Sequence, residues 1–140
     1  MPQTVRRAIH ADIPALIRIR TDVRENRLSN PLSIGAAEYA AFMAHSPIWV
    51  FEENGAVRGF TAGDTSNGTI WALFVDPPDE GRGIGRTLLG KACETLRDAG
   101  WATIQLSTAP NTRAERFYRQ NGWTPAGWTE GGEVVFEKQA

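Results

Sequence analysis

The sequence predicts a mixed α/β fold in which helices cover both faces of a β-sheet of about seven strands. Three observations carry this prediction. Short apolar segments with turn signals between them fill residues 48–75, a helical apolar stripe follows at residues 84–96, and strand-like and helical segments alternate after it. The predicted order is one strand, two helices, three strands, a helix and a strand in alternation, and a final strand pair.

The first third of the chain predicts one strand and two helices. Residues 5–9 have strand character. Asp12 can cap a helix that tolerates Pro14 in its first turn, and this helical segment ends before Pro31. Residues 35–45 predict a second helix with a weaker apolar pattern.

The centre of the chain predicts three strands. Residues 48–53 and 57–61 flank Asn54-Gly55, a dipeptide typical of a tight hairpin. Residues 69–75 are mostly apolar, which is typical of a strand buried on both faces. This strand is expected to stop at Asp76, before two prolines.

The last third predicts two helices and three strands. A helix is expected to begin near Gly83 and to end at Gly100, since glycine suits the position after a helix end. Thr112 and Glu115 fit a capping box at the start of a later helix. The expected elements after Gly100 are a strand, a helix and two strands at residues 101–106, 111–120, 123–128 and 133–137.

Composition narrows the class of protein. The 15 Lys and Arg residues nearly balance the 16 Asp and Glu residues, so a net charge of −1 gives no general attraction to nucleic acid or to an anionic membrane. Cys93 is the only cysteine, which excludes an intrachain disulfide. No apolar run approaches the roughly 20 residues that span a bilayer. We therefore expect one cytoplasmic domain over residues 1–140, with neither nucleic acid nor a membrane as its partner.

A glycine-rich turn joins the strand at residues 69–75 to the next helix. Gly81, Gly83 and Gly85 let the backbone turn sharply and let a ligand approach the main chain. Free N–H groups and the helix dipole make the start of a helix an anion site, and Arg82 and Arg86 add positive charge. A pyrophosphate suits such a site, although a glycine-rich turn that only connects two elements is the simpler interpretation. Neither a nucleoside-triphosphate loop nor a dinucleotide fingerprint matches.

Residues 111–123 carry a second motif, Asn-Thr-Arg-Ala-Glu-Arg-Phe-Tyr-Arg-Gln-Asn-Gly-Trp. With the glycine-rich turn, it resembles the Gcn5-related N-acetyltransferase (GNAT) superfamily. That family carries Arg/Gln-x-x-Gly-x-Gly/Ala after its fourth strand and Asn-x-x-Ala-x-x-Phe-Tyr-x-x-x-Gly-Phe on the following helix. The resemblance covers residues 70–128. Two positions depart from it: Glu80 replaces Arg or Gln, and Trp123 replaces Phe. Since the loop acts mainly through backbone amides, we expect Glu80 to be tolerated.

The resemblance implies a sheet that splays open between its fourth and fifth strands, with acetyl-coenzyme A in the opening and no metal. It also implies direct transfer of the acetyl group to a primary amine in a ternary complex, and often a homodimer. Tyr118 would protonate the departing thiolate, unless it is only a core residue. Coenzyme contacts would come from the loop, from the backbone of the fourth strand and from the second motif: Phe74, Val75, Gly81, Arg82, Gly83, Ile84, Gly85, Arg86 and Asn111.

Several roles stay open at this stage. Asn111 can contact the pantetheine arm or cap its helix, and a backbone N–H near Leu73 or Phe74 can hold the oxyanion. Arg113, Arg116 and Arg119 are expected on a solvated surface, with a contact to the coenzyme phosphates as the alternative. The strand at residues 70–75 contains no general base. The candidates elsewhere, acting through water or simply solvated, are His10, His45, Glu52, Glu53 and Asp64.

The acceptor is expected to be a small polar molecule. Residues 22–31 have mixed charge and are predicted to form the acceptor loop, which suits a small amine better than a long peptide. Amino acids, antibiotic-like molecules, protein N-termini and lysines remain alternatives. The main competing function is a non-catalytic module that binds or senses acyl-coenzyme A, favoured by Glu80 and opposed by Tyr118. A nucleic-acid-binding domain is a third, disfavoured by the net charge.

Overall fold

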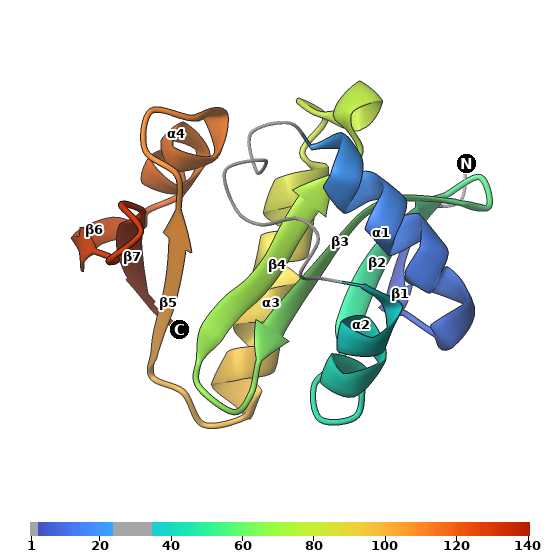
Figure 1. The fold of residues 1–140 in the computed structure, drawn as a ribbon, viewed down its shortest axis with the longest axis horizontal. Helices are drawn as coiled ribbons and strands as arrows, with labels where there is room; N and C mark the ends of the chain where they lie inside the picture. Colours follow the sequence, from blue (N-terminus) through green and yellow to red (C-terminus); the bar gives the residue numbers. More distant parts are fainter. Residues whose placement is uncertain (1–2, 24–34) are drawn as a thin grey trace.

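The computed structural model describes residues 3–23 and 35–140, and the predicted acceptor loop lies almost wholly outside them. One seven-stranded sheet has the order β1-β2-β3-β4-β5-β7-β6 (Figure 1). This agrees with the predicted mixed sheet. The strands are β1 Gln3–Arg7, β2 Ile48–Glu53, β3 Ala56–Asp64, β4 Thr69–Val75, β5 Thr103–Thr108, β6 Thr124–Trp128 and β7 Val134–Gln139.

The first four strands form an antiparallel unit. The predicted hairpin turn joins β2 to β3, and Asn54 and Gly55 both have positive φ, of 53° and 78°, as this kind of turn requires. β3 pairs with β4 from Asp64↔Thr69 to Gly59↔Val75. β4 is therefore firmly held along one edge.

The sheet opens between β4 and β5. These strands are parallel and pair only at Thr69↔Gln105, near the start of each, whereas β5 pairs with β7 over six residue pairs. Figure 1 shows β4 and β5 diverging from this end. Beyond Thr69, the backbone groups of β4 that point away from β3 have no strand partner in the described chain. The predicted splay is thus confirmed.

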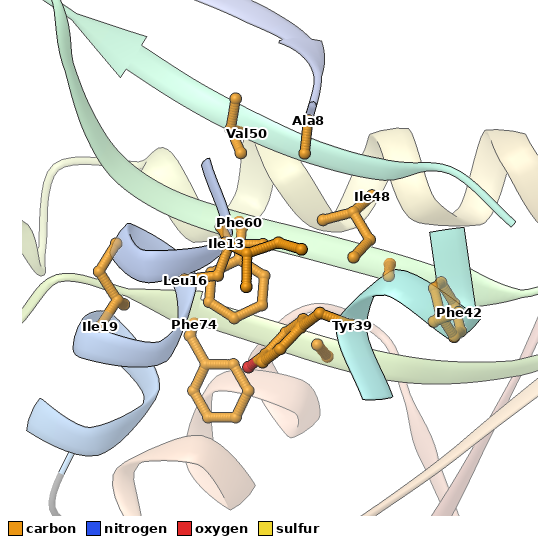
Figure 2. Close-up of a cluster of buried hydrophobic side chains, with 12 residues drawn as sticks. Ala8, Ile13, Leu16, Ile19, Tyr39, Phe42, Ile48, Val50, Phe60 and Phe74 are labelled. Carbon is orange, nitrogen blue, oxygen red and sulfur yellow. The ribbon is translucent and has the colours of Figure 1, made fainter. Parts of the chain in front are cut away.

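Two helices cover one face of the β1–β4 unit. They are α1 Ile13–Asp22 and α2 Ala36–Met43. Figure 2 shows Tyr39 of α2 beside Phe60 and Phe74 of the sheet, and the Tyr39 ring meets the Phe60 ring edge-on with centroids 6.1 Å apart. Trp71 stacks on Phe42 at 4.1 Å, so this tryptophan belongs to the same core.

Two later helices of the described chain pack on the opposite face. They are α3 Ile84–Asp98 and α4 Arg113–Gln120. Apolar residues of α3, among them Leu89 and Leu96, pack with Ile104 of β5 and Tyr118 of α4. Half of the predicted capping box is present. Thr112 Oγ1 accepts a hydrogen bond from the Glu115 N–H, whereas the Glu115 carboxylate accepts from the Asn111 N–H instead of the Thr112 N–H. Helices thus cover both faces.

The predicted strand 101–106 begins two residues late, at Thr103. Trp101 lies before it and donates its indole N–H to the Thr65 carbonyl, 2.9 Å away. A Cβ at Gly68 would lie 2.6 Å from the Trp101 ring, so this ring packs closely against the β3–β4 turn. Trp101 therefore contacts the turn instead of extending the strand. The tryptophan holds the start of β5 beside this turn.

The described residues contain neither a membrane-spanning helix nor a metal-binding cluster. No helix in residues 3–23 and 35–140 is long and apolar enough to cross a membrane. The same residues contain no group of three or more His, Cys, Asp or Glu side chains placed to hold a metal ion.

Candidate active site

The loop after β4 leads directly into the start of α3. β4 ends at Val75, a short 3-10 turn spans Pro77–Asp79, and Gly83 precedes the first helical residue with φ of 86°. The first bond of the helix runs from the Thr87 N–H to the Gly83 carbonyl, 3.2 Å away. The N–H groups of residues 84–86 therefore have no partner within the helix, and its first turn contains no acidic residue. This geometry favours a bound anion.

Gly85 and Gly83 differ in how they would accommodate a side chain. A Cβ at Gly85 would lie 3.6 Å from the Phe117 ring and 3.6 Å from Val75, at ordinary contact distance. At Gly83, by contrast, a Cβ would meet nothing within 4 Å, but the left-handed backbone disfavours any side chain there. A side chain at Gly83 would therefore strain the backbone, whereas a methyl group at Gly85 would fit between its neighbours.

An ion-pair network ties the loop to the β2–β3 hairpin. The Arg82 guanidinium donates to both oxygens of Glu53, at 2.7 and 3.0 Å, and to Asp79 at 2.8 Å. Gln3 donates to Glu53 at 2.7 Å. Arg82, followed by Gln3, lowers the pKa of Glu53 to about 2. Arg82 is therefore engaged within the protein, and its role in coenzyme binding stays a prediction.

Two further contacts connect the loop region to α4. Glu80 Oε1 lies 3.3 Å from Arg113 Nη1, at the start of α4. Arg86, on the first turn of α3, donates to Asn121 Oδ1 at 3.3 Å, just after the end of α4. Glu80, which departs from the motif of the resembled family, thus pairs with an arginine rather than facing the loop unpaired.

A cavity of about 490 Å³ lies where these elements meet. Seven of the nine predicted coenzyme-binding residues line it, whereas Arg82 and Asn111 do not. Asn111 has φ of 62° and donates its backbone N–H to Glu115 at 2.6 Å. The lining residues that the sequence predicted are Phe74, Val75, Gly81, Gly83, Ile84, Gly85 and Arg86.

Tyr118 lies in the wall of this cavity. Its ring is buried against Trp123, with centroids 5.8 Å apart, and against Phe117 at 5.3 Å. Burial raises the pKa of the Tyr118 hydroxyl well above its ordinary value. The phenol therefore stays protonated at neutral pH, as a proton donor must.

A second cavity, of about 160 Å³, adjoins the first. Its walls come from α1, β4, β5, α4 and the turn before β7. Four residues line both cavities and form their common wall: Leu73, Phe74, Ala114 and Tyr118.

The predicted general bases lie elsewhere. None of His10, His45, Glu52, Glu53 and Asp64 is among the described residues that line either cavity. Glu52 accepts from Arg6 at 2.8 Å, and Asp64 accepts from the Ser66 hydroxyl at 2.6 Å. Their catalytic roles stay untested predictions without geometric support.

The structure adds lining residues that sequence reasoning missed. Val23 and Asn121 line the larger cavity, and Arg20, Ser107 and Glu133 line the smaller one. Arg113 and Arg116, expected on a solvated surface, also line the larger cavity. The Asn121-Gly122 dipeptide predicts the end of a helix from local sequence. No local pattern predicts that the other added residues line the same cavities.

The sequence matches the acetyltransferase (GNAT) family profile over residues 15–123. A mycothiol acetyltransferase from Beutenbergia cavernae is 34% identical over 86 residues, which are 57% of this chain and 29% of that protein. The chain thus matches less than a third of that relative's length.

Solved structures resemble the whole chain. One is paia N-acetyltransferase from Thermoplasma acidophilum in complex with coenzyme A, with TM-score 0.81, 17% identity and 100% of both chains covered. Another is the putative acetyltransferase yncA from Salmonella typhimurium with acetyl-CoA, with TM-score 0.79, 22% identity, and 99% of this chain and 94% of that chain covered. At these identities, the likeness concerns the fold.

Proposed function

Because the chain belongs to the GNAT family of acetyltransferases, we propose that it transfers an acetyl group from acetyl-coenzyme A to a primary amine, by direct attack in a ternary complex. One observation carries the proposal: two neighbouring cavities of unequal size both have Tyr118 in their walls. The larger one suits the coenzyme and the smaller one the acceptor. We also infer that residues 1–140 act as one domain.

The larger cavity has the charges that coenzyme A requires. The free N–H groups at the start of α3 suit the pyrophosphate. Arg86, Arg113 and Arg116 line the same cavity and add positive charge for phosphate groups. Phe74 and Val75 offer the free edge of β4 to the pantetheine amides, which would pair with it like an added strand. The bound coenzyme would thus direct its thioester toward Tyr118.

The reaction needs a neutral amine from the acceptor and two contributions from the chain. A neutral amine in the smaller cavity attacks the thioester carbonyl carbon. A backbone N–H of β4 near Leu73 holds the developing oxyanion. Tyr118, kept protonated by burial, gives its proton to the departing thiolate.

The test combines binding with chemistry. We expect coenzyme A at 100 times its dissociation constant to raise the unfolding free energy by about 2.7 kcal/mol, read as a melting shift. We also expect thiol release from acetyl-coenzyme A with at least one amine of a broad library. No shift at millimolar ligand, in protein shown to be folded, would refute coenzyme binding.

The second candidate function is a non-catalytic module that binds or senses acyl-coenzyme A. It is favoured by β4, which carries no acidic or basic side chain, and by Glu80 in the loop. A melting shift with acetyl-coenzyme A but no thiol release with any amine would favour this candidate over the transferase.

A further inference from the structure

Two side chains of opposite charge line the smaller cavity. Arg20 comes from the last turn of α1, and Glu133 immediately precedes β7. Among the described residues in that lining, these are the two charged ones. A molecule that fills this cavity therefore meets one cationic and one anionic group beside Tyr118.

Arg20 is placed over β4. Its guanidinium carbon lies 5.0 Å from the centroid of the Phe74 ring, and Phe74 is one of the residues shared by the two cavities. Arg18 anchors the same end of α1 to the end of β4 through two contacts with Asp76, at 2.9 and 3.3 Å. Figure 1 shows this end of α1 beside the tip of β4.

The Arg20 charge has no carboxylate partner at ion-pair distance in residues 3–23 and 35–140. Its planar guanidinium can bind a carboxylate through two parallel hydrogen bonds. Stacking on Phe74 reduces the freedom that it would lose on binding.

Glu133 is placed over the end of β5. Its Oε1 accepts a hydrogen bond from the Ser107 hydroxyl at 3.0 Å, and its backbone is bonded twice to Thr129, at 2.9 and 3.0 Å. Its Oε2 makes no hydrogen bond or ion pair that the structure records among the described residues. This oxygen can bind an ammonium group and accept a proton.

We propose that the acceptor carries a carboxylate beside its reacting amine, as an amino acid does, with Arg20 binding the carboxylate and Glu133 the amine. The inference rests on the proposed acetyl transfer and adds the class of acceptor. Arg20 contacts Phe74 of β4 and Glu133 contacts Ser107 of β5, the two strands that diverge, so the acceptor would bridge the opening in the sheet.

The protons balance in this arrangement. The acceptor's ammonium gives one proton to Glu133, which passes it to solvent. The nitrogen lone pair then forms the bond to the thioester carbon, and the carbon–sulfur bond breaks. Sulfur takes a proton from Tyr118, and the second proton of the nitrogen restores the one that Tyr118 gave. The net release is the single proton of the ammonium.

The experiment compares L-amino acids with their carboxamides in a thiol-release assay. The carboxamide keeps the amine and removes the negative charge. A neighbouring carboxylate stabilises the ammonium form, so at neutral pH the carboxamide has the larger fraction of reactive neutral amine. We expect at least one amino acid to exceed its carboxamide in kcat/KM by about 10–100-fold, the value of a charge-assisted hydrogen bond.

Variants assign the effect to the two residues. Arg20→Gln should abolish the preference by raising KM for the amino acid alone, and Arg20→Lys should restore part of it. Glu133→Gln should lower kcat for acid and carboxamide alike. Coenzyme affinity should stay unchanged in all three. Arg97→Gln and Glu137→Gln, which remove the same charges outside both cavities, are the matched controls.

The outcomes separate this inference from the proposed function. Equal or faster turnover of carboxamides, or turnover of peptide N-termini alone, overturns the inference and leaves the transferase standing. Arg20→Gln acting equally on acid and carboxamide, or Glu133→Gln with unchanged kcat, also overturns it. Binding of coenzyme A without thiol release from any amine overturns both.

Discussion

Replacing each of two loop glycines by alanine should change stability in opposite directions. Gly83 has φ of 86°, and a left-handed conformation costs an L-residue about 1–2 kcal/mol. Gly85 is the second residue of α3, where its Cβ would meet Phe117 and Val75 at 3.6 Å. An alanine that fits its backbone stabilises by about 0.4–1 kcal/mol, because the unfolded chain loses freedom. Gly83→Ala and Gly85→Ala should therefore differ by roughly 1.4–3 kcal/mol.

Urea unfolding of the free protein measures this difference. For a domain near this size, 1 kcal/mol corresponds to about 2–4 °C in Tm, so thermal scans give a second reading. Unfolding should show equal m-values for both variants and wild type, because the exposed surface hardly changes. The change in unfolding free energy of each variant is taken relative to wild type.

Coenzyme binding by calorimetry completes the comparison. Gly85→Ala should retain affinity, since the added methyl rests between Phe117 and Val75. Gly83→Ala should lose affinity as well as stability, because the N–H groups beside it must keep their direction. Gly85→Ala being less stable than wild type, or Gly83→Ala being equal to it, would refute the reasoning.

Three further predictions concern single side chains. Tyr118→Phe should lower single-turnover rate by up to about 10²–10⁴-fold with little change in coenzyme affinity; a full rate would exclude the phenol as the acid. Glu80→Gln should bind coenzyme A as well as wild type or better in calorimetry, since it removes a negative charge beside the loop, 3.3 Å from Arg113; weaker binding would contradict this. Arg82 lowers the pKa of Glu53 from 4.5 to about 2, so Glu53 stabilises the fold fully above pH 4.5 and loses that effect as pH falls to about 2. The stability deficit of Glu53→Gln, measured by urea unfolding, should accordingly shrink over that range, and a constant deficit would disprove the linkage.

Local sequence signals predicted most of the fold because each acts over a few residues. Asn54-Gly55 requires positive φ at both positions, and both have it. Thr112 and Glu115 cap a helix from positions three residues apart. The apolar period of residues 84–96 needs only one helix face to be buried. The splay between β4 and β5 was predicted instead from the family resemblance, because no local pattern shows where two neighbouring strands stop pairing.

The partners of the site residues could not be predicted, because they are set by tertiary distance. The sequence predicts Arg82 as a coenzyme contact, but Glu53, which lies 29 positions earlier, accepts a hydrogen bond from its guanidinium at 2.7 Å. Arg20 and Glu133 are 113 positions apart, yet they line one cavity. The pattern of charges along the chain does not show which distant residues come together in the fold.

The opening in the sheet has a structural cost that α3 offsets. With one residue pair between β4 and β5, the β5–β7–β6 unit gains little from backbone pairing with the other four strands. Ile84 and Leu88 of α3 pack with Phe51 of β2, while Leu89 and Leu96 pack with the β5–β7 cluster, so one helix joins the two halves of the sheet. The same helix presents its free N–H groups to the larger cavity. A bound anion there therefore acts on the element that holds both halves together, and coenzyme binding should stabilise the divergence between β4 and β5 rather than close it.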